Sequence, residues 1–452
     1  MTHFVNVDRN TPMLLPPDLR DWVADDDLVH FVIEAIEKMK LSFHINRRRS
    51  GSRQYPPKMM LALVVYCYCN RIFSSRRIER ATYRDVSVRY LTGNTHPDHD
   101  TICKFRRENF QAVGEAFLQI LLLAVEMGIL KLGAVSTDGS HFYASASVHR
   151  NVCYDRACQL EEQLRNDIAL LLKEAEEADE RDDKDGQSLP AEMARREDLL
   201  KRMEEARGRL EGNAKKRAET QRLAYEKEEK ERETQGIKRR GRKPKPPDDR
   251  PRDDEITNLT DPDSRAMRKG KNKTCTQSYN AQAVVDAEGS MLIVGGYVTN
   301  HANDANELLP TVASVDESLG EVKAVLADTG YVNLDAFEEL EAAGIELFVA
   351  VKGNEDEDCR QYDYRPEGKR KKKGRVIKDS RLLDMQKKLK TDAGREMYSK
   401  RKETVEPVFG IIKQVMGFRQ FLLRGLEKVN GEWLLVRLAY NMKRMQTLVA
   451  GN

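Results

Sequence analysis

The sequence predicts an α/β protein with a helical N-terminal region and a long helical insertion in its core. Short apolar runs at residues 134–137 and 325–327 each end in an aspartate, Asp138 and Asp328, as buried strands of open α/β sheets do. Residues 155–235 have helical periodicity but are too polar to form a core of their own. The first 115 residues carry signals for helices. The strands that end in Asp-Gly or Asp-x-Gly come only later in the chain.

Length and composition limit the broad class. A chain of 452 residues suggests two or three domains, and 40% hydrophobic residues suffice for a core. The net charge of +3 says little about partners, although the cations occur in separate runs. The sequence has no signal-peptide-like start and no apolar run long enough for a membrane. Its seven cysteines form no Cys-x-x-Cys pair, which favours buried thiols in a reducing, cytoplasmic location.

The N-terminal region, residues 1–115, is predicted to be a helical, helix-turn-helix-like DNA-binding domain. Pro56 and Pro57 open an apolar helix, and Ser74 and Ser75 offer an N-cap for the basic helix that follows. A further helix covers about residues 101–107. The predicted contacts to DNA are the cations of these two short helices, Arg76, Arg77, Lys104, Arg106 and Arg107. The alternative is a helical bundle with a solvated basic face.

Residues 150–275 are predicted to be an insertion. It contains an antiparallel helical hairpin whose apolar stripe consists of Leu160, Leu164, Ile168, Leu199, Met203 and Leu210. The two arms either pack only on each other or also meet a second protomer or DNA. Its tail, residues 238–247, resembles an AT-hook and includes the predicted DNA contacts Arg240 and Arg242. Lys243 stands where the hook has proline, which favours a flexible basic linker that binds phosphates without sequence preference.

Strand-like sequence resumes near residue 276 and continues the core that residues 116–149 begin. A hairpin is predicted over 279–298, and Asp304 is expected to cap a helix over 305–319. The strand that ends in Asp328, a helix over 334–343 and a strand over 345–351 follow. A final helical region begins near residue 395, and the catalytic core is expected to extend to residue 452.

This order of elements is that of a ribonuclease-H-like fold. That fold places two aspartates on neighbouring strands and a third carboxylate on a later helix. Asp138 and Asp328 fit the first two positions, and Glu403 and Glu406 are the candidates for the third. Because proline is tolerated in a first helical turn, Pro407 places Glu406 at a helix start and favours it.

The chain resembles the DDE transposases of bacterial insertion sequences. The resemblance rests on Thr-Asp-Gly at 137–139, Ala-Asp-Thr-Gly-Tyr at 327–331 and Val-Glu-Pro-Val-Phe-Gly-x-x-Lys at 405–413. The last motif is similar to the Tyr-Arg-Glu-Lys signature of one branch, whose members would be Tyr398, Arg401, Glu406 and Lys413. Four residues instead of three separate Arg401 from Glu406, and Lys402 occupies the expected arginine position.

The resemblance implies a transposase that binds the ends of its element and catalyses metal-dependent DNA cleavage and strand transfer. The implied catalytic and metal-binding residues are Asp138, Asp328 and Glu406, with Mg²⁺ or Mn²⁺, two ions per site. Arg401 and Lys413 would neutralise phosphates, and Tyr398 would position the DNA strand. The implied partners are terminal inverted repeats, target DNA and at least one further copy in a synaptic complex near the bacterial nucleoid. The alternative is a catalytically inactive DNA-binding protein of transposase descent.

Overall fold

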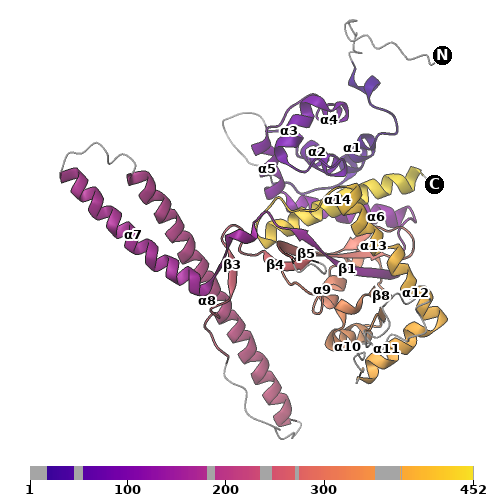
Figure 1. The fold of residues 1–452 in the computed structure, drawn as a ribbon. Helices are drawn as coiled ribbons and strands as arrows, with labels where there is room; N and C mark the ends of the chain where they lie inside the picture. The colour runs from indigo at the N-terminus through magenta and orange to yellow at the C-terminus, as the bar shows by residue number, and fades with distance from the viewer. Residues whose placement is uncertain are drawn as a thin grey trace, which may run out of the picture.

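The computed structural model describes residues 18–44, 54–180, 189–234, 247–269, 274–351, 377 and 379–450. A central mixed sheet is covered by helices, and a long helical hairpin projects from this body (Figure 1). The predicted α/β class is therefore confirmed. Among these residues, no helix has both the length and the apolar character needed to cross a membrane.

The N-terminal region is helical, as predicted. A short 3-10 turn, η1 (Leu19–Trp22), precedes α1 (Leu28–Lys38), α2 (Pro57–Cys69), α3 (Ser75–Arg84), α4 (Val86–Leu91), α5 (His99–Glu108) and α6 (Phe110–Glu126). Pro57 begins α2, where its missing N–H costs no helical hydrogen bond. The side chain of Asp98 accepts a hydrogen bond from the Thr101 N–H and so caps α5.

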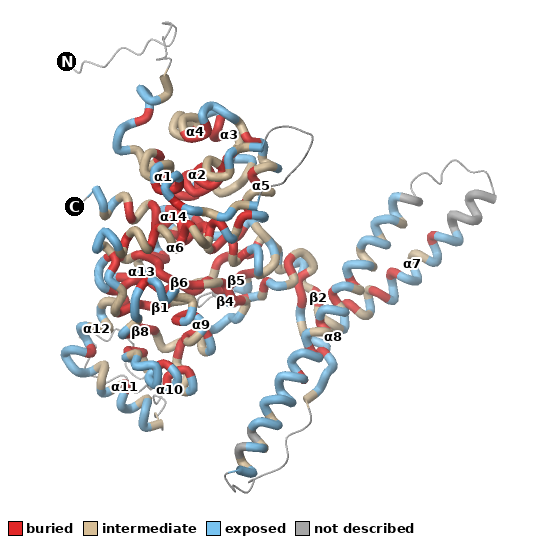
Figure 2. The backbone as a smooth tube through the Cα atoms, turned by 180° about the vertical axis from the view of Figure 1, so that it is seen from behind, coloured by how far each residue is buried: buried red, intermediate tan, exposed pale blue. Residues whose placement is uncertain are grey.

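Helix α2 brings N-terminal and C-terminal parts of the chain into contact. Its residues 60–69 are all buried, which is typical of a helix surrounded by protein on every side. It packs against α1 and against the last helix, α14 (Leu426–Ala450), which also contacts α6 (Figure 2). One continuous hydrophobic core therefore includes α1, α2, α6, α14 and the sheet. The predicted boundary at residue 115 falls inside α6, and the N-terminal helices are not a separately packed unit.

The central sheet has the strand order β4–β5–β1–β8–β9. Strand β1 (Ala134–Tyr143) pairs antiparallel with β5 (Thr274–Asp286) and parallel with β8 (Ala324–Ala327), which pairs parallel with β9 (Glu346–Val349). On its other edge β5 pairs with β4 (Arg265–Lys269), β6 (Ile293–Gly295) and β7 (Val298–Thr299). Strand β4 lies before residue 276, so the core resumes earlier than predicted. Its charged sequence leaves only Met267 as a buried apolar side chain.

Helices cover both faces of the sheet (Figure 1). Helices α6 and α14 lie on one side, and α9 (Leu308–Ala313) and α10 (Leu334–Ala342) lie on the other. The turns η4 (Glu317–Leu319) and η5 (Thr329–Tyr331) flank β8. The C-terminal part continues through α11 (Ser380–Lys390), α12 (Asp392–Glu403), α13 (Val405–Gly410) and a π-helical turn, η7 (Ile411–Val415).

The insertion forms a helical hairpin of two unequal arms, α7 (Tyr154–Glu180) and α8 (Leu189–Thr234). The predicted apolar stripe pairs the arms internally, since Leu164, Met203 and Ala206 are buried in one cluster. Helix α8 continues past the base of the hairpin (Figure 1). After the turn η2 (Val148–Arg150), a two-stranded sheet of β2 (Asn151–Cys153) and β3 (Ile256–Asn258) joins the insertion to the body.

Candidate active site

Asp138 and Asp328 come from neighbouring parallel strands. The register pairs Ser136 of β1 with Leu326 of β8, so that Asp138 and Asp328 continue the two strands at the same level. Strand β8 is buried along its whole length, which explains its short apolar sequence. Asp328 follows its last residue, at the carboxyl end where open α/β sheets place their polar sites.

One oxygen of Asp328 has a local role. Its Oδ1 accepts a hydrogen bond of 2.7 Å from the Gly330 N–H and caps the turn η5. The element that Asp328 caps is this 3-10 turn, and the next helix, α10, is capped by Asn333. The same carboxylate is close enough to Asp138 and Arg401 to affect the pKa of both.

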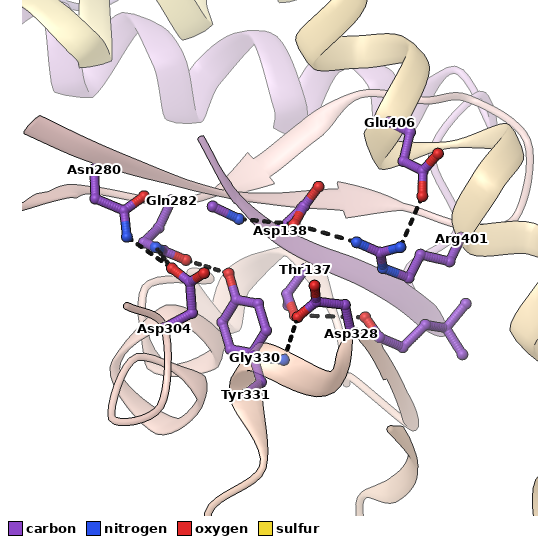
Figure 3. Close-up of polar contacts among 12 residues, drawn as sticks. Thr137, Asp138, Asn280, Gln282, Asp304, Asp328, Gly330, Tyr331, Arg401 and Glu406 are labelled. Carbon is purple, nitrogen blue, oxygen red and sulfur yellow. Dashed lines mark hydrogen bonds and ion pairs between the residues drawn. The ribbon is translucent and has the colours of Figure 1, made fainter. Parts of the chain in front are cut away.

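Glu406 lies in the first turn of α13, as the position of Pro407 predicted. The side chain of Arg401 joins it to the strands: its Nη1 donates to Glu406 Oε1 at 2.8 Å, and its Nη2 lies 3.2 Å from Asp138 Oδ1 (Figure 3). Glu403, the last residue of α12, is exposed as Glu406 is, but it is Glu406 that pairs with Arg401. The geometry thus favours Glu406 as the third carboxylate of the group.

The irregular spacing between Arg401 and Glu406 has a structural explanation. Thr404, with φ −114° and ψ −81°, interrupts the helix and separates α12 from α13. The additional residue falls at this break, so Arg401 still reaches Glu406 across five positions. Lys402, at the position expected from the signature, is exposed. Arg401 is therefore the residue that contacts the carboxylates.

Burial is the largest influence on the pKa of Asp138. It raises the pKa of Asp138 from 3.8 to about 6; Arg401 opposes this rise, and the negative charge of Asp328 adds to it. Nearby carboxylates raise the pKa of Arg401 against the effect of its burial, and its Nε is buried without a hydrogen-bond partner. A single guanidinium thus offsets a local excess of carboxylates.

Tyr398 and Lys413 lie beside this group. Tyr398 is half-buried one helical turn before Arg401, where it packs against the apolar cluster that contains Leu326 and Phe348, and burial raises its pKa. The ammonium of Lys413 contacts Ser140 Oγ, donates to the carbonyl of His141 at 3.1 Å and lies over the Phe142 ring. Lys413 is thus held along β1, two residues beyond Asp138.

Asp304 also belongs to this edge of the sheet, which the sequence pattern did not indicate. Its Oδ1 accepts hydrogen bonds of 2.7 Å from Asn280 Nδ2 and Gln282 Nε2 (Figure 3). The predicted capping role is wrong, because α9 begins at Leu308 after Glu307 and has no side-chain cap. A second polar residue of the group is Tyr331, whose hydroxyl donates to Gln282 Oε1. Burial, followed by the charge of Asp304, raises the pKa of Tyr331.

The predicted DNA contacts of the N-terminal region lie on two helices, α3 and α5, and differ in their exposure to solvent. Arg76 and Arg77 are exposed on α3, and Arg80 and Arg84 extend the same helix with exposed guanidinium groups. On α5, Arg107 is exposed, but Lys104 is half-buried and pairs with Glu108 at 3.8 Å.

Arg106 does not fit the predicted contact with DNA. It is buried and donates to Tyr68 Oη at 2.8 Å and to the Phe73 carbonyl at 2.9 Å. Tyr68 in turn donates to the buried Glu432 of α14. Arg106 therefore cross-links α5, α2 and α14, and we no longer propose it as a DNA contact. Arg240 and Arg242 lie outside the residues that the structure describes.

The carboxylates supply donors of the kind that Mg²⁺ and Mn²⁺ prefer. In the described conformation, however, no set of three or more His, Cys, Asp or Glu side chains among the described residues is spaced to hold a metal ion. Arg401 lies between Asp138 and Glu406 instead. The donor types fit a hard divalent cation, and Arg401 pairs with two of the carboxylates.

Comparison with known proteins adds two matches in different parts of the chain. Residues 253–442 match the family model described as Transposase DDE domain, and residues 17–108 match Transposase domain (DUF772). The first match contains Asp304, Asp328, Arg401 and Glu406 and begins after β1 and the hairpin. No curated protein and no solved structure matched the chain.

The DDE domain implies a ribonuclease-H-like core and an enzyme of a group that generally uses divalent metal ions. Its matched region contains one of the two neighbouring aspartate positions and the arginine-linked glutamate. Together with the second match, it assigns the chain to DNA transposition and recombination by an insertion sequence. The two matches together support a transposase of the DDE type.

Proposed function

We propose that this transposase binds the ends of its own insertion element, cleaves the DNA there and transfers the strand to a target. Asp138, Asp328 and Glu406 are the proposed catalytic carboxylates. The observation that carries the proposal is the register that places Asp138 and Asp328 on adjacent strands, with Arg401 linking Asp138 to Glu406. The Tyr-Arg-Glu-Lys branch is the proposed affiliation, with Tyr398, Arg401, Glu406 and Lys413 as its signature residues.

The three carboxylates would hold the divalent cations, which we propose to be two Mg²⁺ or Mn²⁺ ions. When bound, such ions activate a water or hydroxyl nucleophile and stabilise the leaving oxygen of an in-line displacement. The protein contributes carboxylates whose backbone is fixed by the sheet and by α13. Asp138 is ionised above a pKa of about 6, so its own carboxylate is charged at neutral pH.

Arg401 lies among the carboxylates, and we propose two tasks for it: to balance their charge and to bind phosphate. Its guanidinium neutralises Asp138 and Glu406 before DNA arrives, with contacts of 3.2 and 2.8 Å. A guanidinium also binds phosphate oxygens in a bidentate manner. Arg401 thus places a phosphate-binding group next to the carboxylates, and the ammonium of Lys413 lies along the same strand, β1.

DNA binding outside this site is proposed for the exposed cations of the N-terminal helices. Arg76 and Arg77 on α3 and Arg107 on α5 are accessible to phosphates, and Lys104 is partly so. The basic tail with Arg240 and Arg242 remains a proposed phosphate-binding segment. Because two element ends must be held together, the active assembly is proposed to contain at least two copies of the chain.

The test uses the full-length protein, a duplex carrying the element's terminal repeat, and Mg²⁺. Asp138→Asn, Asp328→Asn and Glu406→Gln should each reduce strand cleavage by about 10²–10³-fold or more, since each removes charge from the reacting centre. Binding of the uncleaved duplex should change little. Glu403→Gln is the matched control, because Glu403 is exposed and close in sequence; it should cleave like the parent protein.

Two results would contradict the assignment. Equal losses in Glu403→Gln and Glu406→Gln would remove the argument for Glu406 as the third carboxylate. Binding of the terminal repeat without cleavage in either Mg²⁺ or Mn²⁺ would favour the alternative, a DNA-binding protein of transposase descent that no longer cuts.

A further inference from the structure

The loop between β7 and α9 brings Asp304 to the candidate active site. Two buried amides of β5 hold its Oδ1, Asn280 and Gln282, each at 2.7 Å. These residues lie on the strand that pairs with β1, where Gln282 is the register partner of Gly139. The carboxylate is therefore fixed directly beside the residue that follows Asp138.

Hydrogen bonds of Glu307 hold the same loop at its other end, just before α9. The buried side chain of Glu307 accepts a hydrogen bond from the Tyr297 hydroxyl, and its Oε1 lies 2.6 Å from Nδ1 of His301. The Glu307 N–H donates to the carbonyl of Asp304 at 3.0 Å. Both the side chain and the backbone of Asp304 are thus held in place by groups outside the set of candidate catalytic residues.

Two glycines leave the space that Asp304 occupies. A Cβ atom at position 139 would overlap Asp304 Oδ1 and would lie 2.5 Å from Gln282 Nε2. A Cβ atom at position 330 would lie 3.5 Å from Asp304 Oδ2 and 2.9 Å from Asp328 Oδ1. One oxygen of Asp304 therefore packs on the glycine after Asp138, and the other faces the glycine of the turn that Asp328 caps.

One buried atom of this cluster has no partner. Asn280 is 1% exposed, and its Oδ1 has no hydrogen-bond donor, although its Nδ2 donates to Asp304. This oxygen points at Gly139, where a Cβ atom would lie only 2.9 Å from it. An unpaired buried acceptor is costly, so its orientation here is explained by the hydrogen bond that its amide gives to Asp304.

We propose that Asp304 is a positioning residue of the transposase active site. Its clamped carboxylate fixes the backbone after Asp138 and the turn after Asp328, and it adds a carboxylate beside these aspartates (Figure 3). The proposal rests on the proposed function of the carboxylates. Asp304 acts on the bound cations through Asp138 and Asp328, in the way that outer residues orient metal ligands.

Asp304→Asn is the most direct test, because asparagine retains an acceptor oxygen for both amides but removes the charge. The readout is the rise in the melting temperature of the full-length, DNA-free protein during titration with Ca²⁺ or Mn²⁺. The concentration needed for half of this rise should increase about 10–100-fold, the usual effect of removing an outer partner. Asp335→Asn is the control: Asp335 is exposed in the first turn of α10, and its loss removes the same charge.

Gly139→Ala gives a second, independent readout, since it displaces Asp304 without altering a carboxylate. It should weaken the response to cations as Asp304→Asn does, while binding of the terminal-repeat duplex stays at the parent level. A parent-like response to cations in both variants would overturn the role of Asp304 and leave the proposed function intact. A parent protein that neither responds to cations nor cleaves DNA would instead overturn the proposed function, and this inference with it.

Discussion

In the helical hairpin two arginines form ion pairs with one buried carboxylate, whereas at the candidate active site one arginine forms ion pairs with two carboxylates. Glu161 of α7 is 5% exposed and pairs with Arg165 at 2.8 Å and with Arg207 at 2.9 Å. Arg401 is shared between Asp138 and Glu406. Both regions are rich in charge, but only the hairpin balances it internally.

This difference separates structural charge from charge kept for a ligand. The arms of the hairpin are stabilised by their own ion pairs and by the buried cluster around Leu164 and Met203. The active-site edge holds Asp328 and Asp304 through N–H donors, those of Gly330 and of the amides of β5. A fold tolerates such an excess of negative charge at a cost in stability, which bound cations would relieve.

The largest change in stability is expected when a substitution removes one of the negative charges at the active-site edge. Without divalent ions, Asp138→Asn should be more stable than the parent protein by up to about 3 kcal/mol at pH 8, because the folded pKa of about 6 exceeds the ordinary 3.8. A raised folded pKa lowers stability as the pH rises through it, so the advantage should fade between pH 6 and pH 4. Urea unfolding in EDTA across this range measures it.

The control for this prediction is Asp335→Asn, which removes a carboxylate from an exposed position in the first turn of α10 and should not reproduce the stabilisation at pH 8. Adding Mg²⁺ should reverse the order of stability, since the parent alone keeps the full set of proposed ligands. An advantage of Asp138→Asn that is constant from pH 4 to pH 8 would show that the buried charge of Asp138 is not its cause.

An intermediate effect is expected at α3, where positive charge is in excess. Arg76, Arg80 and Arg84 recur every four residues, and such like-charged neighbours destabilise a helix. Changing these three and Arg77 to alanine should weaken binding of the terminal-repeat duplex. The slope of log K against log salt should fall by about 0.9 for each phosphate that the protein no longer neutralises. Fluorescence anisotropy at several salt concentrations measures both quantities.

Arg195 and Arg209 provide the matched control, because they are also exposed cations but lie on the hairpin. Their replacement by alanine should leave the salt slope near the parent value. If both sets of variants lowered the slope equally for each arginine removed, binding would depend on overall charge and the N-terminal helices would be a solvated bundle.

The smallest effect is expected in the hairpin itself. Glu161→Gln leaves Arg165 and Arg207 without their shared carboxylate, but both guanidinium groups are partly exposed and remain hydrated. The loss of stability should be about 1 kcal/mol, seen as a lower melting temperature with unchanged strand cleavage. Glu205→Gln, at an exposed position of α8, should not differ from the parent. A loss of cleavage in Glu161→Gln would mean that the hairpin's ion pairs serve catalysis as well.

Short-range features of the sequence predicted many of the helices and strands of this fold. The apolar run before Asp328, the prolines at the start of α2 and the stripe of α7 and α8 each predicted the element that is found. Asp138 was predicted at a strand end but lies inside β1, which runs on to Tyr143. Its polar continuation is stabilised by pairing with β5, from far along the chain.

The remaining features depend on partners that no local pattern reveals. Asp304 has the sequence context of a helix cap, yet its partners lie on β5, more than twenty residues earlier. Arg106 belongs to a run of cations typical of a solvated face, but its partners are on α2 and on the loop after it. Strand β4 lacks apolar alternation because it is an edge strand with little to bury. Each case was decided by tertiary contacts.

The packing of α2 on α14 has a consequence for synthesis. Helix α2 emerges early from the ribosome, but its buried face is completed by the last helix of the chain, whose Glu432 also accepts the Tyr68 hydroxyl. Until residues 426–450 are made, the apolar residues of α2 that face α14 lack their native cover. We therefore expect incomplete chains to be targets for chaperones and proteases rather than stable competitors for element ends. Premature termination would remove a transposase molecule instead of producing a truncated inhibitor of transposition.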